Sequence, residues 1–206
     1  MNNTRIALVG APLLWVAGWT VMRAGGNRGA NAGWDIAHSL WIVAFVLFPV
    51  AAGAIARKMT GSVAARIGYG LTVAGCAALG VQVVIDLVVG LVSADHAAMN
   101  RHYESVFGTP GVELVFYQLG PILFYLGLPV LLITAALRGT ASWAAALLTT
   151  GGVLMSAVGH GLPGWARILE GIGVLVLGAG LIAGAGRPGR TAEPGQGRIA
   201  TADSSS

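Results

Sequence analysis

The sequence predicts an all-α fold, a polytopic bundle of six transmembrane helices that occupies residues 1–186. The first observation is composition: 55% of the residues are hydrophobic, only 10% are charged and the mean hydropathy is +0.75, far from the averages of soluble domains. The second is a series of apolar segments, each close to the roughly 20 residues with which a helix crosses a bilayer. The third is the lack of the alternating pattern that membrane β-barrels need, so each segment is expected to bond its backbone internally as a helix.

The apolar segments follow one another along most of the chain. They span approximately residues 6–22, 36–56, 67–93, 112–137, 142–159 and 166–184. The 32 glycines agree with this interpretation, since small residues let membrane helices approach closely. The first segment precedes the stretch "GANA" and also has features of a signal peptide, an alternative that the sequence leaves open. Cys76 is the single cysteine, which excludes an internal disulfide and a CxxC redox pair.

The distribution of lysine and arginine predicts that both termini are cytoplasmic. With the N-terminus inside, the cytoplasmic side holds Arg5, Arg57, Lys58, Arg66, Arg138, Arg187, Arg190 and Arg198. The outer side receives only Arg23, Arg28, Arg101 and Arg167. This asymmetry follows the positive-inside rule, so the net charge of +4 reflects membrane topology and not nucleic-acid binding. Residues 187–206, rich in Gly, Pro and Ser, are expected to form a disordered cytoplasmic tail.

An aspartate interrupts the third segment in the stretch "VQVVIDLVVGLV". Asp86 precedes Ser93 by about two helical turns, which places it roughly 10 Å below the outer end of the helix. A charged carboxylate at that depth costs about 3 kcal/mol on insertion scales, so we expect Asp86 to carry a proton. Helical spacing predicts one inward-facing stripe, made of Gly75, Gln82, Asp86, Gly90 and Ser93.

Other polar and aromatic residues fall in the outer halves of the predicted helices, and together they predict an outward-facing cavity. The candidate catalytic residues are Asp86, Glu170, His160 and Glu113. The candidate substrate-binding residues are Trp15, Trp19, His38, Gln82, Tyr117, Gln118 and Tyr125. No HExxH or paired histidine spacing predicts a metal site, and no cofactor is expected.

Several residues near this cavity also fit plain structural roles. Asp35 is predicted to cap the second helix, which would place His38 in the first turn near water. Trp34, Trp41 and Trp165 are expected to anchor the chain at the membrane interface. A buried hydrogen bond that locks neighbouring helices is the structural alternative for Asp86.

A carboxylic acid in a dry pocket can protonate an alkene or epoxide, and aromatic faces can stabilise the resulting carbocation. Asp86 in "VVIDLVV", Glu170 in "RILEGIG", Glu113 in "GVELVFYQLG" and the stretch "WDIAHSLW" supply such groups. In these residues and in its size, the chain resembles the small integral-membrane terpene cyclases of bacterial and fungal meroterpenoid pathways. The resemblance implies an enzyme that cyclises a hydrophobic isoprenoid-like substrate taken from the lipid bilayer.

The resemblance also implies roles for single residues. Asp86 or Glu170 would donate the first proton, and His160 or Glu113 would accept the last one. The cation-stabilising wall would consist of Trp15, Trp19 and Tyr117.

Other classes of protein fit the same residues. A small proton-coupled transporter would use Asp86 and Glu170 as a relay between two inverted three-helix halves. A haem-binding subunit would use His38 and His160 as axial ligands. A structural subunit without chemistry would account for the small residues equally well. The oligomeric state is left open by the sequence.

Overall fold

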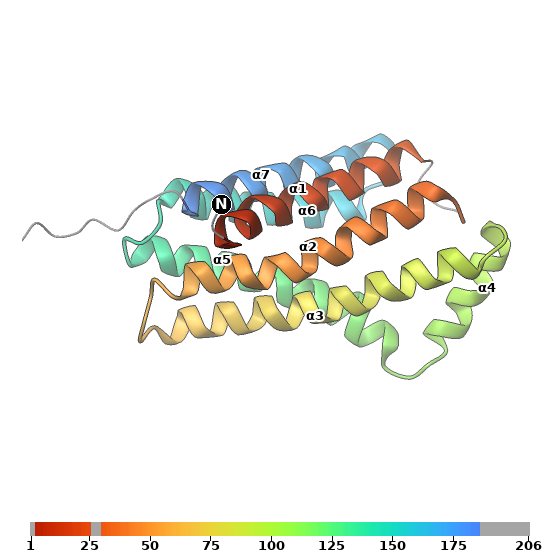
Figure 1. The fold of residues 1–206 in the computed structure, drawn as a ribbon, viewed down its shortest axis with the longest axis horizontal. Helices are drawn as coiled ribbons and strands as arrows, with labels where there is room; N and C mark the ends of the chain where they lie inside the picture. Colours follow the sequence, from red (N-terminus) through yellow and green to blue (C-terminus); the bar gives the residue numbers. More distant parts are fainter. Residues whose placement is uncertain (1–2, 26–29, 186–206) are drawn as a thin grey trace, which may run out of the picture.

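A computed structural model of the chain describes residues 3–25 and 30–185 (Figure 1). Throughout these ranges the regular structure is helical and no strand occurs, which confirms the all-α prediction. The helices are α1 (Asn3–Ala24), α2 (Ala32–Ala56), α3 (Val63–Val92), α4 (His96–Phe107), the π-helix η1 (Glu113–Leu119), α5 (Gly120–Leu137), α6 (Trp143–Gly161), the 3₁₀ helix η2 (Gly164–Arg167) and α7 (Ile168–Ala185). The tail predicted for residues 187–206 lies outside the described ranges.

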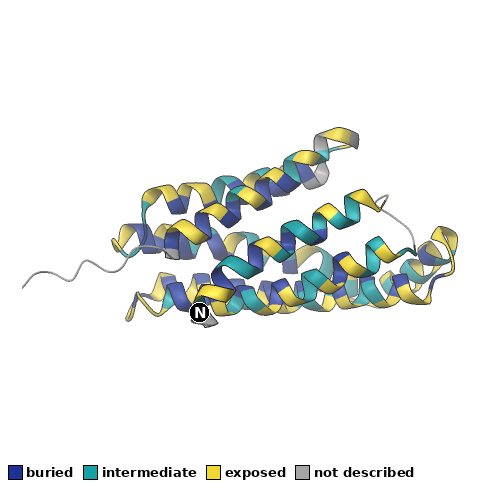
Figure 2. Ribbon diagram, turned by 45° about the horizontal axis from the view of Figure 1, so that its top comes forward, coloured by how far each residue is buried: buried dark blue, intermediate teal, exposed yellow. Residues whose placement is uncertain are grey.

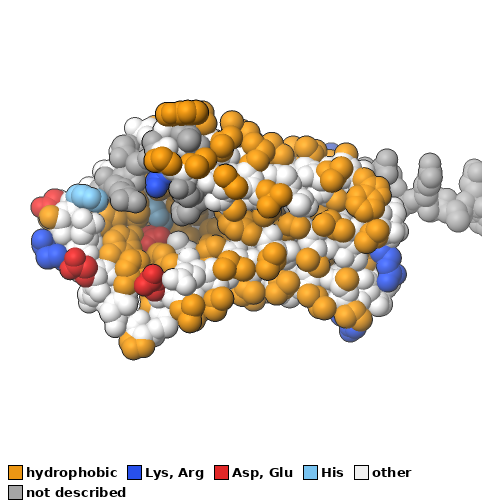
Figure 3. All heavy atoms as spheres, turned by 180° about the vertical axis from the view of Figure 1, so that it is seen from behind, with side chains coloured by type: hydrophobic (Ala, Val, Ile, Leu, Met, Phe, Trp, Pro, Cys, Tyr) orange, Lys and Arg blue, Asp and Glu red, His pale blue; other side chains and the backbone are white. Residues whose placement is uncertain are grey.

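Four helical stretches of the described part are long and apolar enough to cross a membrane. They are Thr4–Ala24, Ala32–Ala56, Val63–Val92 and the continuous pair of η1 and α5, Glu113–Leu137. The shorter α6 and α7 are also apolar. Hydrophobic side chains cover the middle of the face drawn in Figure 3, and charged side chains gather toward its two ends. This distribution is the one that a lipid bilayer favours.

The long helices run side by side along the long axis of the molecule (Figure 1). α1 packs between α2 and α7, α3 packs on α2 and α5, and α6 packs on α5 and α7. Buried residues face the inside of this bundle and exposed residues face outward (Figure 2). The largest fully buried side chains are Phe48, Phe124, Leu128, Leu131, Leu132, Leu177 and Leu181.

Glycines bring the backbones of two helix pairs into direct contact. A Cβ atom at Gly127 of α5 would lie 2.5 Å from the backbone nitrogen of Thr72 in α3. A Cβ atom at Gly68 of α3 would lie 2.8 Å from the backbone nitrogen of Leu131 in α5. Gly180 has the same role in the pair of α6 and α7. These small residues therefore act as contact points between helices, as small residues do in membrane bundles.

The start of α2 differs from the prediction. Asn31 is the N-cap residue, and its side chain accepts a hydrogen bond of 3.0 Å from the backbone nitrogen of Trp34. Asp35 lies within the first turn instead of capping the helix. Both residue types cap helices well, and the helix begins one turn earlier than expected. This shift moves His38 into the second turn and toward the bundle interior.

The helix α4 was not predicted from the sequence. It is too short and too polar to span a bilayer, and it follows directly on the end of α3. Its Asp95 cap accepts a hydrogen bond from the backbone nitrogen of Ala98, and Met99 is buried. His102 Nδ1 lies 2.9 Å from Ser93 Oγ, so α4 folds back onto the end of α3.

Candidate functional site

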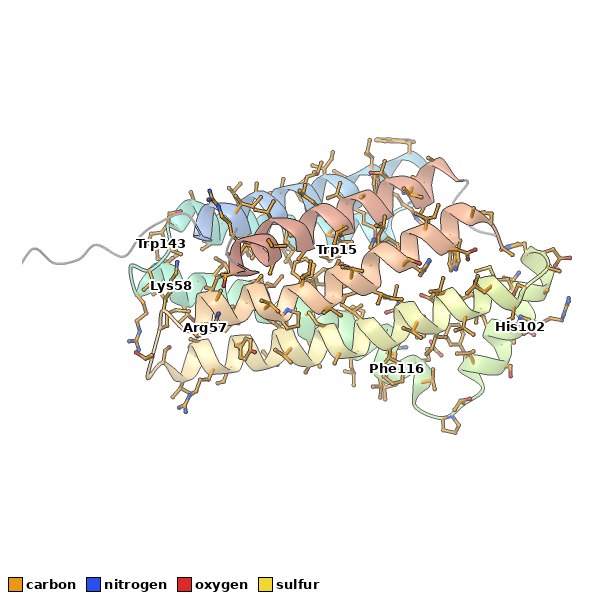
Figure 4. All side chains as sticks on the ribbon, viewed as in Figure 1. Trp15, Arg57, Lys58, His102, Phe116 and Trp143 are labelled. Atoms are coloured by element: carbon orange, nitrogen blue, oxygen red, sulfur yellow. The ribbon has the colours of Figure 1, made fainter. Side chains whose placement is uncertain are left out.

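A cavity of about 460 Å³ lies in the half of the bundle that contains Asp86. Every long helix contributes to its lining, from Trp15 in α1 to Glu170 in α7. Figure 4 places Arg57 and Lys58 at one end of the bundle and His102 at the other, and the cavity lies toward the His102 end. Figure 3 shows a hollow in this half, where acidic, basic and histidine side chains lie among hydrophobic ones.

Asp86 is almost completely buried in the lining of this cavity, with 8% of its surface exposed. Its Oδ1 atom accepts hydrogen bonds from the hydroxyls of Tyr103, at 2.8 Å, and Tyr117, at 2.7 Å. Its Oδ2 atom lies 3.8 Å from Nε2 of His38. The two phenols hold Oδ1 as an acceptor, so Oδ2 is the oxygen that is able to carry a proton.

His38 faces Asp86 in a defined tautomer. Its Nδ1 atom lies 2.7 Å from the carbonyl oxygen of Trp34, which can only accept, so Nδ1 carries the hydrogen. In a neutral imidazole, Nε2 is then an acceptor that faces Oδ2 of Asp86. The 3.8 Å between these two atoms is longer than a hydrogen bond, so His38 lies beside the carboxyl group without bonding to it. The expectation that His38 lies near water is wrong, because the ring is only 2% exposed and stacks near Trp34 and Trp41.

Two tryptophans expected at the membrane interface lie in the cavity wall instead. Trp34 Nε1 donates a 2.8 Å hydrogen bond to the carbonyl oxygen of Asp86, and Trp41 Nε1 donates one of 2.9 Å to the carbonyl oxygen of Trp15. A buried indole N–H needs an acceptor, and in both cases the backbone of a neighbouring helix supplies it. Trp165 is 89% exposed, as an interface anchor would be.

Three of the tryptophans in the cavity wall fit against a glycine of a neighbouring helix. The pairs are Trp41 with Gly18, Trp34 with Gly90 and Trp19 with Gly171. A Cβ atom at any of these glycines would lie 2.5 Å from an atom of the indole. The glycines therefore create the space that the rings occupy.

Trp15 lies at the base of the cavity within a cluster of aromatic rings. Its ring centroid is 5.4 Å from that of Phe124 and 5.9 Å from that of Phe45, both in tilted or edge-on arrangements. Tyr125 stacks against it at 6.3 Å, and its hydroxyl lies 3.4 Å from Ser156 Oγ. The base of the cavity is consequently aromatic and rigidly packed.

Tyr117 reaches Asp86 from the π-helix η1. Such helices are rare and occur frequently at functional sites, because the wider turn redirects side chains. The two other predicted residues of η1, Glu113 and Gln118, do not line the cavity. Both are exposed, and Gln118 Nε2 donates a 3.3 Å hydrogen bond to Glu113 Oε1.

Two polar atoms in the cavity lining are buried without a hydrogen-bond partner among the described residues. They are Nε1 of Trp19, a donor, and Oε1 of Gln82, an acceptor. Such orphaned groups are uncommon in native structures and are costly unless a ligand or water satisfies them. A polar group of a bound substrate would find both a donor and an acceptor here.

The remaining predicted residue of α7 and two arginines complete the cavity. Glu170 and Arg167 line it from α7 and η2, and Arg23 lines it from α1 with its guanidinium 5.3 Å from the centroid of Trp19. His160 belongs to α6, but its side chain lies outside the described part of the chain. The structure thus brings eight of the predicted side chains into one cavity, namely Trp15, Trp19, His38, Gln82, Asp86, Tyr117, Tyr125 and Glu170.

Sequence reasoning missed Tyr103, because the polar stretch around it was taken as a connection between membrane segments. A weak signal exists in the sequence, since Met99 and Tyr103 are one helical turn apart and face α3.

Among the described residues, no three His, Cys, Asp or Glu side chains gather into a metal site. Comparison with family models, curated proteins and solved structures found no match to this chain.

Proposed function

We propose that the chain crosses the membrane six times, with both termini in the cytoplasm. α6 and α7 are shorter than the other spans, but they pack in the same bundle and line the same cavity. The basic residues Arg57 and Lys58 lie at the end away from the cavity (Figure 4). Under the positive-inside rule that end is cytoplasmic and the cavity lies toward the outer surface.

We further propose that the cavity is the active site of a membrane enzyme that cyclises a hydrophobic, isoprenoid-like substrate by protonating it. The observation that carries this proposal is the setting of Asp86, a buried carboxyl group with two phenol donors on one oxygen and His38 beside the other. The carboxyl group of Asp86 is placed to donate a proton, and the aromatic faces of the cavity can stabilise the cation that results.

The reaction begins when Oδ2 of Asp86 transfers its proton to one carbon of a substrate alkene. The alkene π electrons form the new C–H bond, and the neighbouring carbon becomes a cation. A second alkene attacks this cation with its own electron pair and closes a ring. Loss of a proton beside the final cation restores a double bond, so the product is an isomer of the substrate and the protein regains one proton.

The protein stabilises both charges that the first step creates. The bonds from Tyr103 and Tyr117 strengthen as negative charge develops on Asp86. The faces of Trp15 and Trp41 attract the carbocation through their quadrupoles. For the final proton, Glu170 is an acceptor that lines the cavity from another wall, since α7 packs on α6 and α1 and not on α3. The same role for His160 or Glu113 stays a prediction.

A proton-coupled carrier is the second candidate, because Asp86 and Glu170 line the same cavity. A carrier must also open toward the opposite side of the membrane. Toward that side the bundle is filled by fully buried side chains such as Leu128, Leu131 and Leu181. The cavity therefore favours an enzyme over a carrier in the conformation described.

The test uses membranes that contain the wild type, Asp86→Asn, or the control Glu104→Gln, which alters an exposed acid of α4. Each is incubated with linear prenylated phenols and their terminal epoxides, and cyclic isomers are identified by chromatography and NMR. We expect the wild type and Glu104→Gln to form cyclic isomers, and Asp86→Asn to lose about 10²–10⁴-fold in rate, the usual contribution of a general acid. Undiminished cyclisation by Asp86→Asn would remove Asp86 as the acid. Proton-coupled uptake into vesicles, without conversion and lost in Asp86→Asn, would establish the carrier instead.

A further inference from the structure

A second hollow lies on the outer surface of the bundle, between α2 and α3. Its volume is about 480 Å³, and it is lined by residues within 42–49 of α2 and 73–85 of α3. Every one of its lining residues is apolar, among them Val46, Pro49, Gly80 and Val84. We refer to this hollow as the lateral groove.

The lateral groove lies near the middle of two long membrane-spanning helices, Ala32–Ala56 and Val63–Val92. At that depth the surroundings of the protein are hydrocarbon. Val46 and Val84 are 65% and 46% exposed, so the groove opens outward. The material that fills it is consequently a hydrocarbon chain.

Phe45 connects the lateral groove with the cavity, because it lines both. Its side chain is only 7% exposed, and its ring packs against Trp15 and Phe124 at the base of the cavity. His38, Trp41 and Phe45 follow one another on the cavity side of α2. Phe45 is therefore the partition between a hydrocarbon-filled groove and the buried acid.

The α2 helix lacks one backbone hydrogen bond at Phe45. Pro49 lies inside α2 and has no N–H group to donate to the carbonyl oxygen of Phe45, one turn earlier. A proline within a helix is the commonest cause of a kink and of local freedom to bend. Movement of Phe45 thus requires less disruption than movement of a residue in an unbroken helix.

We propose that the lateral groove binds the hydrocarbon tail of the substrate within the bilayer, and that the tail reaches the cavity past Phe45. This inference rests on the proposed function, because it takes the substrate to be isoprenoid. It adds the route by which the substrate arrives and the site that holds its chain. The occupant is a linear prenyl chain and not bulk phospholipid, since the ring of Phe45 alone is shared by the groove and the cavity that holds Asp86, and only the substrate has a reason to pass it.

Two glycines of α3 provide a matched pair of variants. A Cβ atom at Gly80 meets no atom within 4 Å, and Gly80 lines the groove, so a side chain can begin there without a clash and occupy the groove. Gly70 is equally open but does not line the groove. Gly80→Phe is therefore the blocking variant and Gly70→Phe its control, and thermal unfolding in detergent checks that both fold like the wild type.

The experiment uses the full chain in phosphatidylcholine vesicles with a linear prenyl alcohol that carries a diazirine. After illumination, the labelled residues are mapped by mass spectrometry. We expect labels on α2 and α3 within the groove, their loss in Gly80→Phe and their retention in Gly70→Phe. The proposal is overturned by labelling spread evenly over the lipid-facing helices, by labelling that Gly80→Phe leaves unchanged, or by equal groove labelling from a diazirine phosphatidylcholine.

Measuring cyclisation in the same variants distinguishes a failure of this inference from a failure of the proposed function. Groove labelling that is specific and lost in Gly80→Phe, without cyclisation by the wild type, would leave the groove established and the cyclisation refuted. Cyclisation by the wild type that Gly80→Phe does not slow would refute the groove as the route and leave the chemistry intact. If both proposals hold, kcat/KM falls in Gly80→Phe and is unchanged in Gly70→Phe.

Discussion

Glycines serve two different purposes in two regions of the bundle. At the contact between α3 and α5, Gly68 lets the backbone of one helix meet the backbone of the other. In the wall of the cavity, Gly18 and Gly90 face the edges of tryptophan rings instead. The same residue type therefore builds a closed helix contact in one region and room for an aromatic wall in the other. The group that faces the glycine decides which of these two structures forms.

This difference has a physical consequence for substitutions. A backbone that meets a new side chain can yield only if two helices move apart, which disturbs all of their contacts. A tryptophan ring can shift, although it then loses the hydrogen bond that orients it. Substitution of a glycine that meets a backbone should therefore reduce stability, and substitution of a glycine that faces a tryptophan ring should mainly reduce activity.

The largest loss of stability is expected from Gly127→Val. Its Cβ atom would lie 2.5 Å from both the backbone nitrogen and Oγ1 of Thr72, so α3 and α5 must separate. We expect a destabilisation of at least about 3 kcal/mol, at the upper end for overpacked sites. Unfolding in mixed micelles measures it. The control is Gly70→Val, whose Cβ atom meets nothing within 4 Å; an equal loss in both variants would contradict close backbone packing as the cause.

A smaller loss of stability is expected from Gly90→Val, which displaces the ring of Trp34 and breaks its bond to the carbonyl oxygen of Asp86. We expect about 1–2 kcal/mol, the value of one buried hydrogen bond plus repacking. The rate of cyclisation should also fall, because the displaced ring of Trp34 packs against the ring of His38, with the centroids 4.2 Å apart. Equal destabilisation by Gly90→Val and Gly127→Val would show that the two kinds of glycine contact do not differ.

The smallest effects are expected from Tyr103→Phe and Tyr117→Phe. Each removes one hydrogen bond to Oδ1 of Asp86 and leaves the aromatic ring in place. A loss of about 1 kcal/mol in transition-state stabilisation corresponds to roughly a fivefold slower reaction. Tyr69→Phe, at the far end of α3, serves as the control. No change in rate for either cavity variant would mean that the phenols do not support the developing carboxylate.

The four long apolar helices were predictable because hydrocarbon imposes a length and a composition on a helix that can cross it. The inward face of α3 was predictable for a similar reason, since Asp86, Gly90 and Ser93 follow helical spacing and all are buried. Neither result required knowledge of the neighbouring helices. The partners of Asp86 did require it, because they come from three other elements, α2, α4 and η1.

What could not be predicted depends on contacts between distant segments. Tyr103 is located in a polar stretch that forms a helix only by packing Met99 and His102 against the end of α3. Trp34 and Trp41 have the composition of interface residues, and the carbonyl groups that accept their indole hydrogens belong to α3 and α1. The shift of the α2 cap from Asp35 to Asn31 changed the depth of His38 by one turn.

The most direct test of the account is an infrared difference spectrum of the wild type against Asp86→Asn, in membranes without substrate. If Asp86 holds the proton that starts the reaction, the wild type has a carboxylic-acid C=O band that Asp86→Asn lacks. That band should also shift in Tyr117→Phe, which removes a hydrogen bond from Oδ1. If no carboxylic-acid band is lost in Asp86→Asn, the carboxyl group is ionised beside His38 and Asp86 is not the acid.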